Sequence, residues 1–167
     1  WENDDYADGL FTYEDGSYKG KFKMRAYHGR GVWIVDDQKW EGTWKDGKAD
    51  GEFNVQYIES GGQTVKIRAW FKNGYIDGKC VLSTDSERIE GVLHPLPPDE
   101  EGTVDYEGEV TWTFGDGYKY VGEVRSFQAA LGGILGLVPY GEGVMYDASG
   151  KVTKKGHFDW MNSEGEN

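Results

Sequence analysis

The residues of this chain that could carry out acid–base or nucleophilic chemistry are few and scattered. Its three histidines, His28, His94 and His157, stand far apart, and none has a catalytic partner at a useful spacing. The sequence contains neither a GxSxG nucleophile elbow nor an HExxH metal-binding segment. We therefore predict that the protein is not an enzyme and has no catalytic residues.

The sequence also contains no recognisable metal-binding or cofactor-binding motif. Cys80 is the only cysteine, which excludes a cysteine metal cluster and an intrachain disulfide. The acidic runs Asp36-Asp37 and Asp99–Glu101 do not follow a calcium-loop pattern, so we interpret them as solvated turns. The glycines near position 133 do not have the spacing of a nucleotide-binding fingerprint. We expect no metal site and no cofactor.

One basic segment, KGKFKMR, could contact an anionic surface. Its four cations alternate along the segment, which places them on one face of a strand: Lys19, Lys21, Lys23 and Arg25. At about 1 kcal/mol per cation near an anionic membrane, four cations bind weakly. The segment is therefore interpreted as a charged sheet face or edge, with lipid binding as the alternative.

The segment Ser126–Pro139, SFQAALGGILGLVP, is uncharged and unlike the rest of the chain. A protein partner is expected to contact its large apolar residues: Phe127, Leu131, Ile134, Leu135, Leu137 and Val138. The other interpretation is that this segment folds over an end of the protein and caps a small core. Insertion into a membrane surface is a third alternative, with only Arg125 as a flanking cation.

Composition limits the class of partner. The chain has 18 Lys and Arg against 30 Asp and Glu, a formal net charge of −12. This charge argues against nucleic acid and against an anionic membrane as the main partner. No run reaches the about 20 apolar residues of a membrane span, so we expect a soluble protein, peripheral to a membrane or a large complex. The chain begins at Trp1, as a processed chain or a fragment would.

A repeated pattern organises the chain. Trp40–Trp44 reads WEGTW, two rings flanking a glycine. Related segments are YKGKF, IRAWF, IEGVL, YEGEV, YVGEV and KKGHF, and all but IRAWF, which has Ala69, keep the central glycine. Residues i, i+2 and i+4 of a strand share one face, so Trp40, Gly42 and Trp44 point the same way. A ring from the neighbouring strand can then lie over the bare glycine. Asp46-Gly47 supplies a turn, and successive hairpins would stack into a sheet.

The segments YKGKFKMRAYHGRGVW, WEGTWKDGKADGEF and FKNGYIDGKC resemble the MORN repeat, whose pattern is roughly YxGxWxxGKxxGxG. The resemblance covers residues 5–93 and resumes at 104–124 and 140–160. It implies an all-β protein: an elongated, single-layer antiparallel sheet of stacked hairpins with one apolar insertion loop, 126–139. The whole chain, 1–167, would be one repeat domain. A proline-rich acidic loop, 94–103, separates the best repeats from a hairpin at Val104–Arg125 and degenerate repeats that end near 160.

The resemblance, with no catalytic set, predicts a non-enzymatic scaffold or a peripheral subunit that docks a protein through the sheet and the 126–139 loop. Two other binding functions stay open. One is a phospholipid-binding module, and the other is a carbohydrate-binding surface built on Trp33, Trp40, Trp44 or Trp70. MORN arrays also accompany kinase and methyltransferase domains, so the chain could be a repeat region of a larger enzyme. A small-molecule substrate is not expected.

Overall fold

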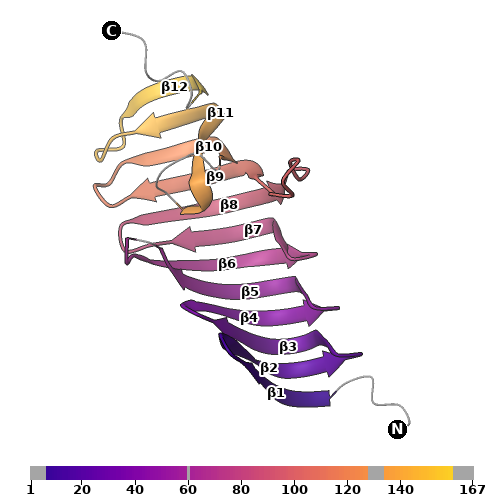
Figure 1. Cartoon of the computed structure of the whole chain (residues 1–167). Helices are drawn as coiled ribbons and strands as arrows, with labels where there is room; N and C mark the ends of the chain where they lie inside the picture. Colours follow the sequence, from indigo (N-terminus) through magenta and orange to yellow (C-terminus); the bar gives the residue numbers. More distant parts are fainter. Residues whose placement is uncertain (1–6, 60, 128–133, 160–167) are drawn as a thin grey trace. The chain divides into compact units, whose positions relative to one another are not determined.

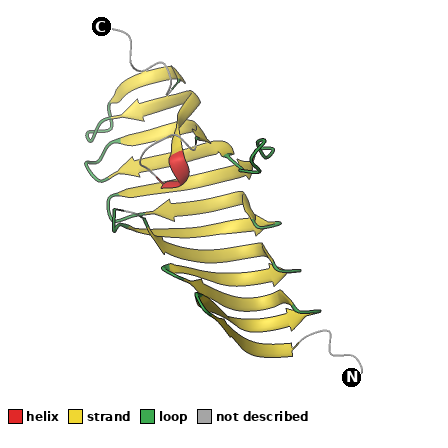
Figure 2. Cartoon of the chain, in the orientation of Figure 1, coloured by secondary structure: helices red, strands yellow, loops and turns green. Residues whose placement is uncertain are grey.

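The computed structural model describes residues 7–59, 61–127 and 134–159, and these residues are mostly β-strand (Figures 1 and 2). Twelve strands form one antiparallel sheet in which each strand lies beside its neighbours in the sequence. The predicted all-β class and consecutive antiparallel hairpins are confirmed. The strands are β1 (Ala7–Tyr13), β2 (Gly16–Lys23), β3 (Ala26–Val35), β4 (Gln38–Lys45), β5 (Lys48–Ile58), β6 (Thr64–Lys72), β7 (Tyr75–Ser83), β8 (Glu87–Pro95), β9 (Tyr106–Phe114), β10 (Lys119–Ser126), β11 (Leu137–Tyr146) and β12 (Val152–Phe158).

The chain divides into two compact units, Trp1–Gly78 and Lys79–Asn167, with the division inside β7. One short 3₁₀ turn, η1 (Ile134–Gly136), precedes β11 in the second unit. The insertion therefore leads directly into a strand.

In the first unit, a row of glycines crosses the sheet. Gly9 pairs with Gly20, Gly20 with Gly31, and Gly31 with Gly42, along β1 to β4. A bare backbone row of this kind leaves room for a flat ring on the sheet face. The register thus turns the glycine pattern of the sequence into a continuous slot.

Tyr18 fills the middle of this slot, at Gly20 and Gly31. Its side chain is fully buried, and its hydroxyl donates a hydrogen bond to the Lys21 carbonyl at 3.0 Å. A Cβ added at Gly31 would fall only 2.6 Å from Cε2 of this ring. The ring also stacks on Tyr27, with centroids 3.8 Å apart. The prediction that a neighbouring ring covers a strand glycine is confirmed here.

The second unit repeats the arrangement with Tyr120. Gly122 pairs with Gly143, and the fully buried ring of Tyr120 lies over Gly143. Its hydroxyl donates to the Glu123 carbonyl at 2.6 Å, three residues ahead as in Tyr18. The same local packing therefore recurs in repeats that differ in sequence.

The turns that join the hairpins also recur. Asp46-Gly47 has φ values of 50° and 82°, which confirms the predicted turn, and Met24-Arg25 adopts positive φ in the equivalent turn. The N–H of Gly47 donates to the Tyr27 carbonyl at 2.9 Å, which ties this turn to the preceding hairpin. The predicted hairpin at Val104–Arg125 is present as β9 and β10.

Burial of the ring hydroxyls predicts a loss of stability at alkaline pH. Burial raises the pKa of Tyr18 and of Tyr120 from 10.0 to about 12, and that of the Cys80 thiol from 9.0 to about 11. The folded state holds these protons more tightly than the unfolded state, so its stability is full below the unfolded pKa values. We expect the urea midpoint to fall as pH rises from about 9 to about 12.

Tyr18→Phe provides the matched control for this pH dependence. The variant should lose about 1 kcal/mol at neutral pH with the hydroxyl hydrogen bond, and should show a shallower alkaline fall. A midpoint that stays constant from about pH 8 to about pH 11.5 in the unmodified chain would contradict the assignment.

Candidate functional site

The first unit carries a groove lined by aromatic rings. Two adjoining pockets, of about 300 and 260 Å³, share Tyr27 and Gly47 and together form it. We define the aromatic groove by its six rings and two cations: Phe11, Phe22, Tyr27, Trp33, Trp40, Trp44, Arg25 and Lys48. These residues come from β1 to β5 and the turns between them.

The strands place the rings at different depths. Trp44 is 6% exposed and forms part of the floor, in edge contact with Tyr27 at a centroid distance of 5.5 Å. Trp33 and Trp40 are half-buried, and their ring centroids are 6.3 Å apart. Phe11, from β1, is 56% exposed. The groove therefore has a rigid ring floor and a partly exposed ring wall.

The indole N–H groups of the groove are already engaged. Trp33 donates to the Tyr13 hydroxyl, Trp44 to the Gly31 carbonyl at 3.2 Å, and Trp40 to Gln38 Oε1 at 3.2 Å. The groove thus offers ring faces to a ligand and keeps these donors for its own packing. Trp70 does not share this surface, because it alternates with buried Ala69 and Phe71 on β6.

The groove is locally cationic although the chain is strongly acidic. Arg25 and Lys48 are exposed, and no carboxylate among the described residues lines either pocket. Among the residues that the structure describes, no ion pair involves either cation. The carboxylate of Asp46, in the adjoining turn, lies 3.4 Å from His28 Nδ1. Both groove cations are therefore available to an anionic partner.

The basic segment predicted from the sequence is divided by its turn. Lys19 and Lys21 are exposed and alternate with buried Tyr18, and the Lys21 stem lies against Gly29. Lys23 is half-buried at the end of β2. Arg25 has a φ of 68° in the turn and lines the groove beside Phe22, so strand alternation does not place it with the lysines.

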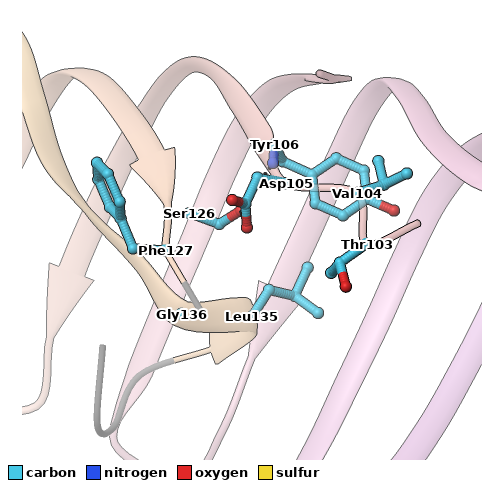
Figure 3. Close-up of a pocket in the computed structure, with 8 residues that line it drawn as sticks. All are labelled: Thr103, Val104, Asp105, Tyr106, Ser126, Phe127, Leu135 and Gly136. Carbon is cyan, nitrogen blue, oxygen red and sulfur yellow. Dashed lines mark hydrogen bonds between the residues drawn. The ribbon is translucent and has the colours of Figure 1, made fainter. Parts of the chain in front are cut away.

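The second unit contains a pocket of about 420 Å³ beside the apolar insertion (Figure 3). Its lining residues are Thr103, Val104, Asp105, Tyr106, Ser126, Phe127, Leu135 and Gly136. Buried Ser126 accepts a hydrogen bond from the Tyr106 N–H at 2.7 Å and donates to Asp105 Oδ1 at 3.1 Å. The polar groups of this wall are thus used to join the loop before β9 to the end of β10.

The predicted partner-binding residues of the insertion differ in position and burial. Leu137 and Val138 are 1% and 8% exposed, because β11 pairs them with Ser126 and Arg125 of β10. They belong to the core and cannot meet a partner, which corrects the expectation for these two residues. Half-buried Phe127 and Leu135 line the pocket. Leu131 lies outside the described residues, and Ile134 begins η1.

Hydrogen bonding supports a structural role for the neck of the insertion. The N–H of Phe127 donates to the Gly136 carbonyl at 3.0 Å, which closes the segment between β10 and β11. The Phe127 ring contacts Tyr140 at a centroid distance of 5.6 Å. These contacts favour the capping interpretation for the described part of the insertion.

The histidines have local roles where contacts define them. His28 Nδ1 accepts the Asp46 N–H at 3.3 Å, and His157 Nδ1 lies 3.5 Å from Glu142. No cluster of three His, Cys, Asp or Glu side chains that could hold a metal occurs in the described part of the chain. None of the helical segments among residues 7–59, 61–127 and 134–159 has the length and apolar character needed to cross a membrane.

A comparison of the sequence with known protein families found no matching family, and a search of curated proteins found no match. Function is therefore inferred from the geometry of the groove and the pocket.

Proposed function

We propose that this protein is a non-enzymatic scaffold of the MORN-repeat type, and that it docks a protein partner in the aromatic groove of its first unit. The observation that carries the proposal is the groove itself: partly exposed rings on a rigid floor, flanked by Arg25 and Lys48. Aromatic residues and arginine are enriched at protein interfaces, where they contribute most of the binding energy. The protein would act as a subunit of a larger assembly.

The groove favours a protein segment over the two other ligand classes. A carbohydrate site needs polar groups beside its rings, whereas the indole N–H groups here are engaged within the protein. A lipid site on the basic segment would need its four cations on one face, but Arg25 lies in the groove. Ring faces with two free cations suit an extended peptide better.

Affinity capture with charge-reversal variants tests this function. The full chain is immobilised and compared with Arg25→Glu/Lys48→Glu, in which both groove cations become acidic. Lys19→Glu/Lys66→Glu is the matched control, because these exposed lysines alternate with buried residues and their reversal changes the net charge equally. All four side chains are exposed, so we expect every variant to fold.

We expect the control to retain a stoichiometric protein partner from native extract, and the groove variant to retain at least tenfold less. Circular dichroism verifies the fold of each variant. Capture of equal amounts of the partner by both variants would contradict the proposal. Loss of the partner only from the control variant would indicate that the partner binds the opposite face of the sheet.

A further inference from the structure

The loop between β8 and β9 carries prolines and carboxylates, which complement the aromatic rings and cations of the groove. Its residues 96–102 read LPPDEEG, two prolines followed by three acids, and all except half-buried Leu96 are exposed. We propose that this proline-acidic loop, 96–102, binds in the aromatic groove of a second copy of the chain. The proposal uses the same groove as the proposed function but requires a different occupant.

Hydrogen bonds hold the loop in a defined shape. Leu96 N–H donates to the Asp105 carbonyl at 2.8 Å, which closes the base of the loop. Asp99 Oδ1 accepts the N–H groups of Glu101 and Thr103 at 2.9 and 2.8 Å, which fixes its tip. Pro97 and Pro98 have restricted φ angles. A preorganised loop loses little entropy on binding, so even a small contact can form.

The prolines match the rings of the groove. Proline-rich segments dock in aromatic-lined grooves, since their rings pack on aromatic faces and their extended backbone is already ordered. Pro97 and Pro98 are exposed at the loop, and Trp33, Trp40 and Phe11 supply partly exposed ring faces. This ring packing requires no hydrogen bond from the indole N–H groups of Trp33 and Trp40, which already donate to Tyr13 and Gln38.

The charges match as well. Asp99 is used within the loop, whereas Glu100 and Glu101 have no side-chain bond or ion pair among the described residues. Arg25 and Lys48 are likewise without an ion pair in the described part of the chain. Two free carboxylates therefore face two free cations across the proposed contact. Such complementarity selects the partner and its orientation.

This contact is heterologous, because a groove on one copy meets a loop on another. Each chain carries one groove and one loop, so repeated contacts build either a ring or an open chain of copies. We expect a dissociation constant of roughly 0.1 mM, since one loop buries far less area than a standard interface. The association should weaken with salt, because exposed charges are screened.

Sedimentation velocity of the full chain tests the proposal. Samples from about 20 μM to about 1 mM bracket the expected constant, at about 50 mM and about 500 mM NaCl. The unmodified chain should associate at low salt. Arg25→Glu/Lys48→Glu and Glu100→Lys/Glu101→Lys should each weaken association at least tenfold. The Lys19→Glu/Lys66→Glu chain is the charge-matched control and should associate as the unmodified chain does.

A charge swap provides the decisive arm. The chain that combines both reversals carries an acidic groove and a basic loop, and it should regain association. The proposal is overturned if the unmodified chain stays monomeric at every concentration tested. Association that persists in both reversal variants also overturns it. If the peptide PLPPDEE quenches tryptophan fluorescence while the chain stays monomeric, the second copy is excluded and an acidic segment of another protein is the occupant.

The two proposals can fail separately. Absent self-association, with extract capture still dependent on Arg25 and Lys48, rejects the second-copy loop and leaves the scaffold function intact. Self-association without any captured protein supports the loop contact and rejects the docking of a different partner.

Discussion

Replacing Gly31 by alanine is expected to destabilise the first unit by about 3 kcal/mol or more, at the upper end of the range for overpacking a rigid core. The glycine lies in the middle of the cross-strand row, paired with Gly20 on one side and Gly42 on the other. All three atoms nearest to an added Cβ belong to Tyr18, and Cε2 would be 2.6 Å away. The ring would have to leave its position.

The surroundings of Tyr18 prevent such a shift. Its hydroxyl is bonded to the Lys21 carbonyl, its face stacks on Tyr27, and Trp44 contacts it edge-on at 5.9 Å. A displaced ring would lose these contacts together, and the backbone of β3 cannot move without breaking its pairing with β4. The cost therefore exceeds that of an ordinary glycine substitution in a strand.

Urea denaturation followed by tryptophan fluorescence measures this cost. Gly61→Ala is the matched control, because a Cβ at Gly61 has no atom within 4 Å, and we expect its midpoint to stay near that of the unmodified chain. A free energy of unfolding for Gly31→Ala within about 0.5 kcal/mol of that of the unmodified chain would show that the ring does not need the bare glycine.

Phe53→Ala is expected to cost about 3–5 kcal/mol, the range for truncating a buried phenylalanine. Phe53 is fully buried on β5 and lies over Gly42, where an added Cβ would be 2.6 Å from the ring. Its ring contacts Trp44 at 5.0 Å and Phe71 at 5.5 Å, both in edge geometry. Truncation removes these contacts and leaves the glycine uncovered.

The control for Phe53→Ala is Ile58→Ala on the same strand, where the side chain is 48% exposed. We expect a loss of less than about 1 kcal/mol there, because little apolar area is buried. Thermal unfolding followed by circular dichroism compares the two variants. Similar losses in both would mean that Phe53 is not part of the ring packing that stabilises the first unit.

The sequence predicts the fold well where the signal is local. The ring-glycine-ring segment Trp40–Trp44 alternates with period two, and the structure places Gly42 and Trp44 in the core as predicted. The Asp46-Gly47 turn follows from the tolerance of both residues for positive φ. Such features depend on neighbours only a few residues away.

The glycine row was not predicted, although its signal is present in the sequence. Gly9, Gly20, Gly31 and Gly42 recur every eleven residues, which is the length of one strand plus its turn. Equal strand-to-strand steps bring equivalent residues into register across an antiparallel sheet. The eleven-residue strand period, rather than the longer hairpin period, is the sequence signal of this glycine row.

The site was less predictable because it depends on the turn and on non-local pairing. Alternation predicts that Arg25 lies on a strand face, but alternation ends where Met24-Arg25 adopts positive φ. Leu137 and Val138 looked exposed in an uncharged segment, yet their burial follows from pairing with β10. Neither outcome can be read from residue type alone.

The most direct test of the docking claim is photo-cross-linking from the groove itself. A photoreactive phenylalanine at position 11 replaces the exposed ring of Phe11, and a matched chain carries it at Lys66 on the opposite face of the unit. After irradiation in native extract, the account predicts a discrete protein adduct from position 11 and none from position 66. An adduct from position 66 alone, or none from either position, would contradict the aromatic groove as the docking surface.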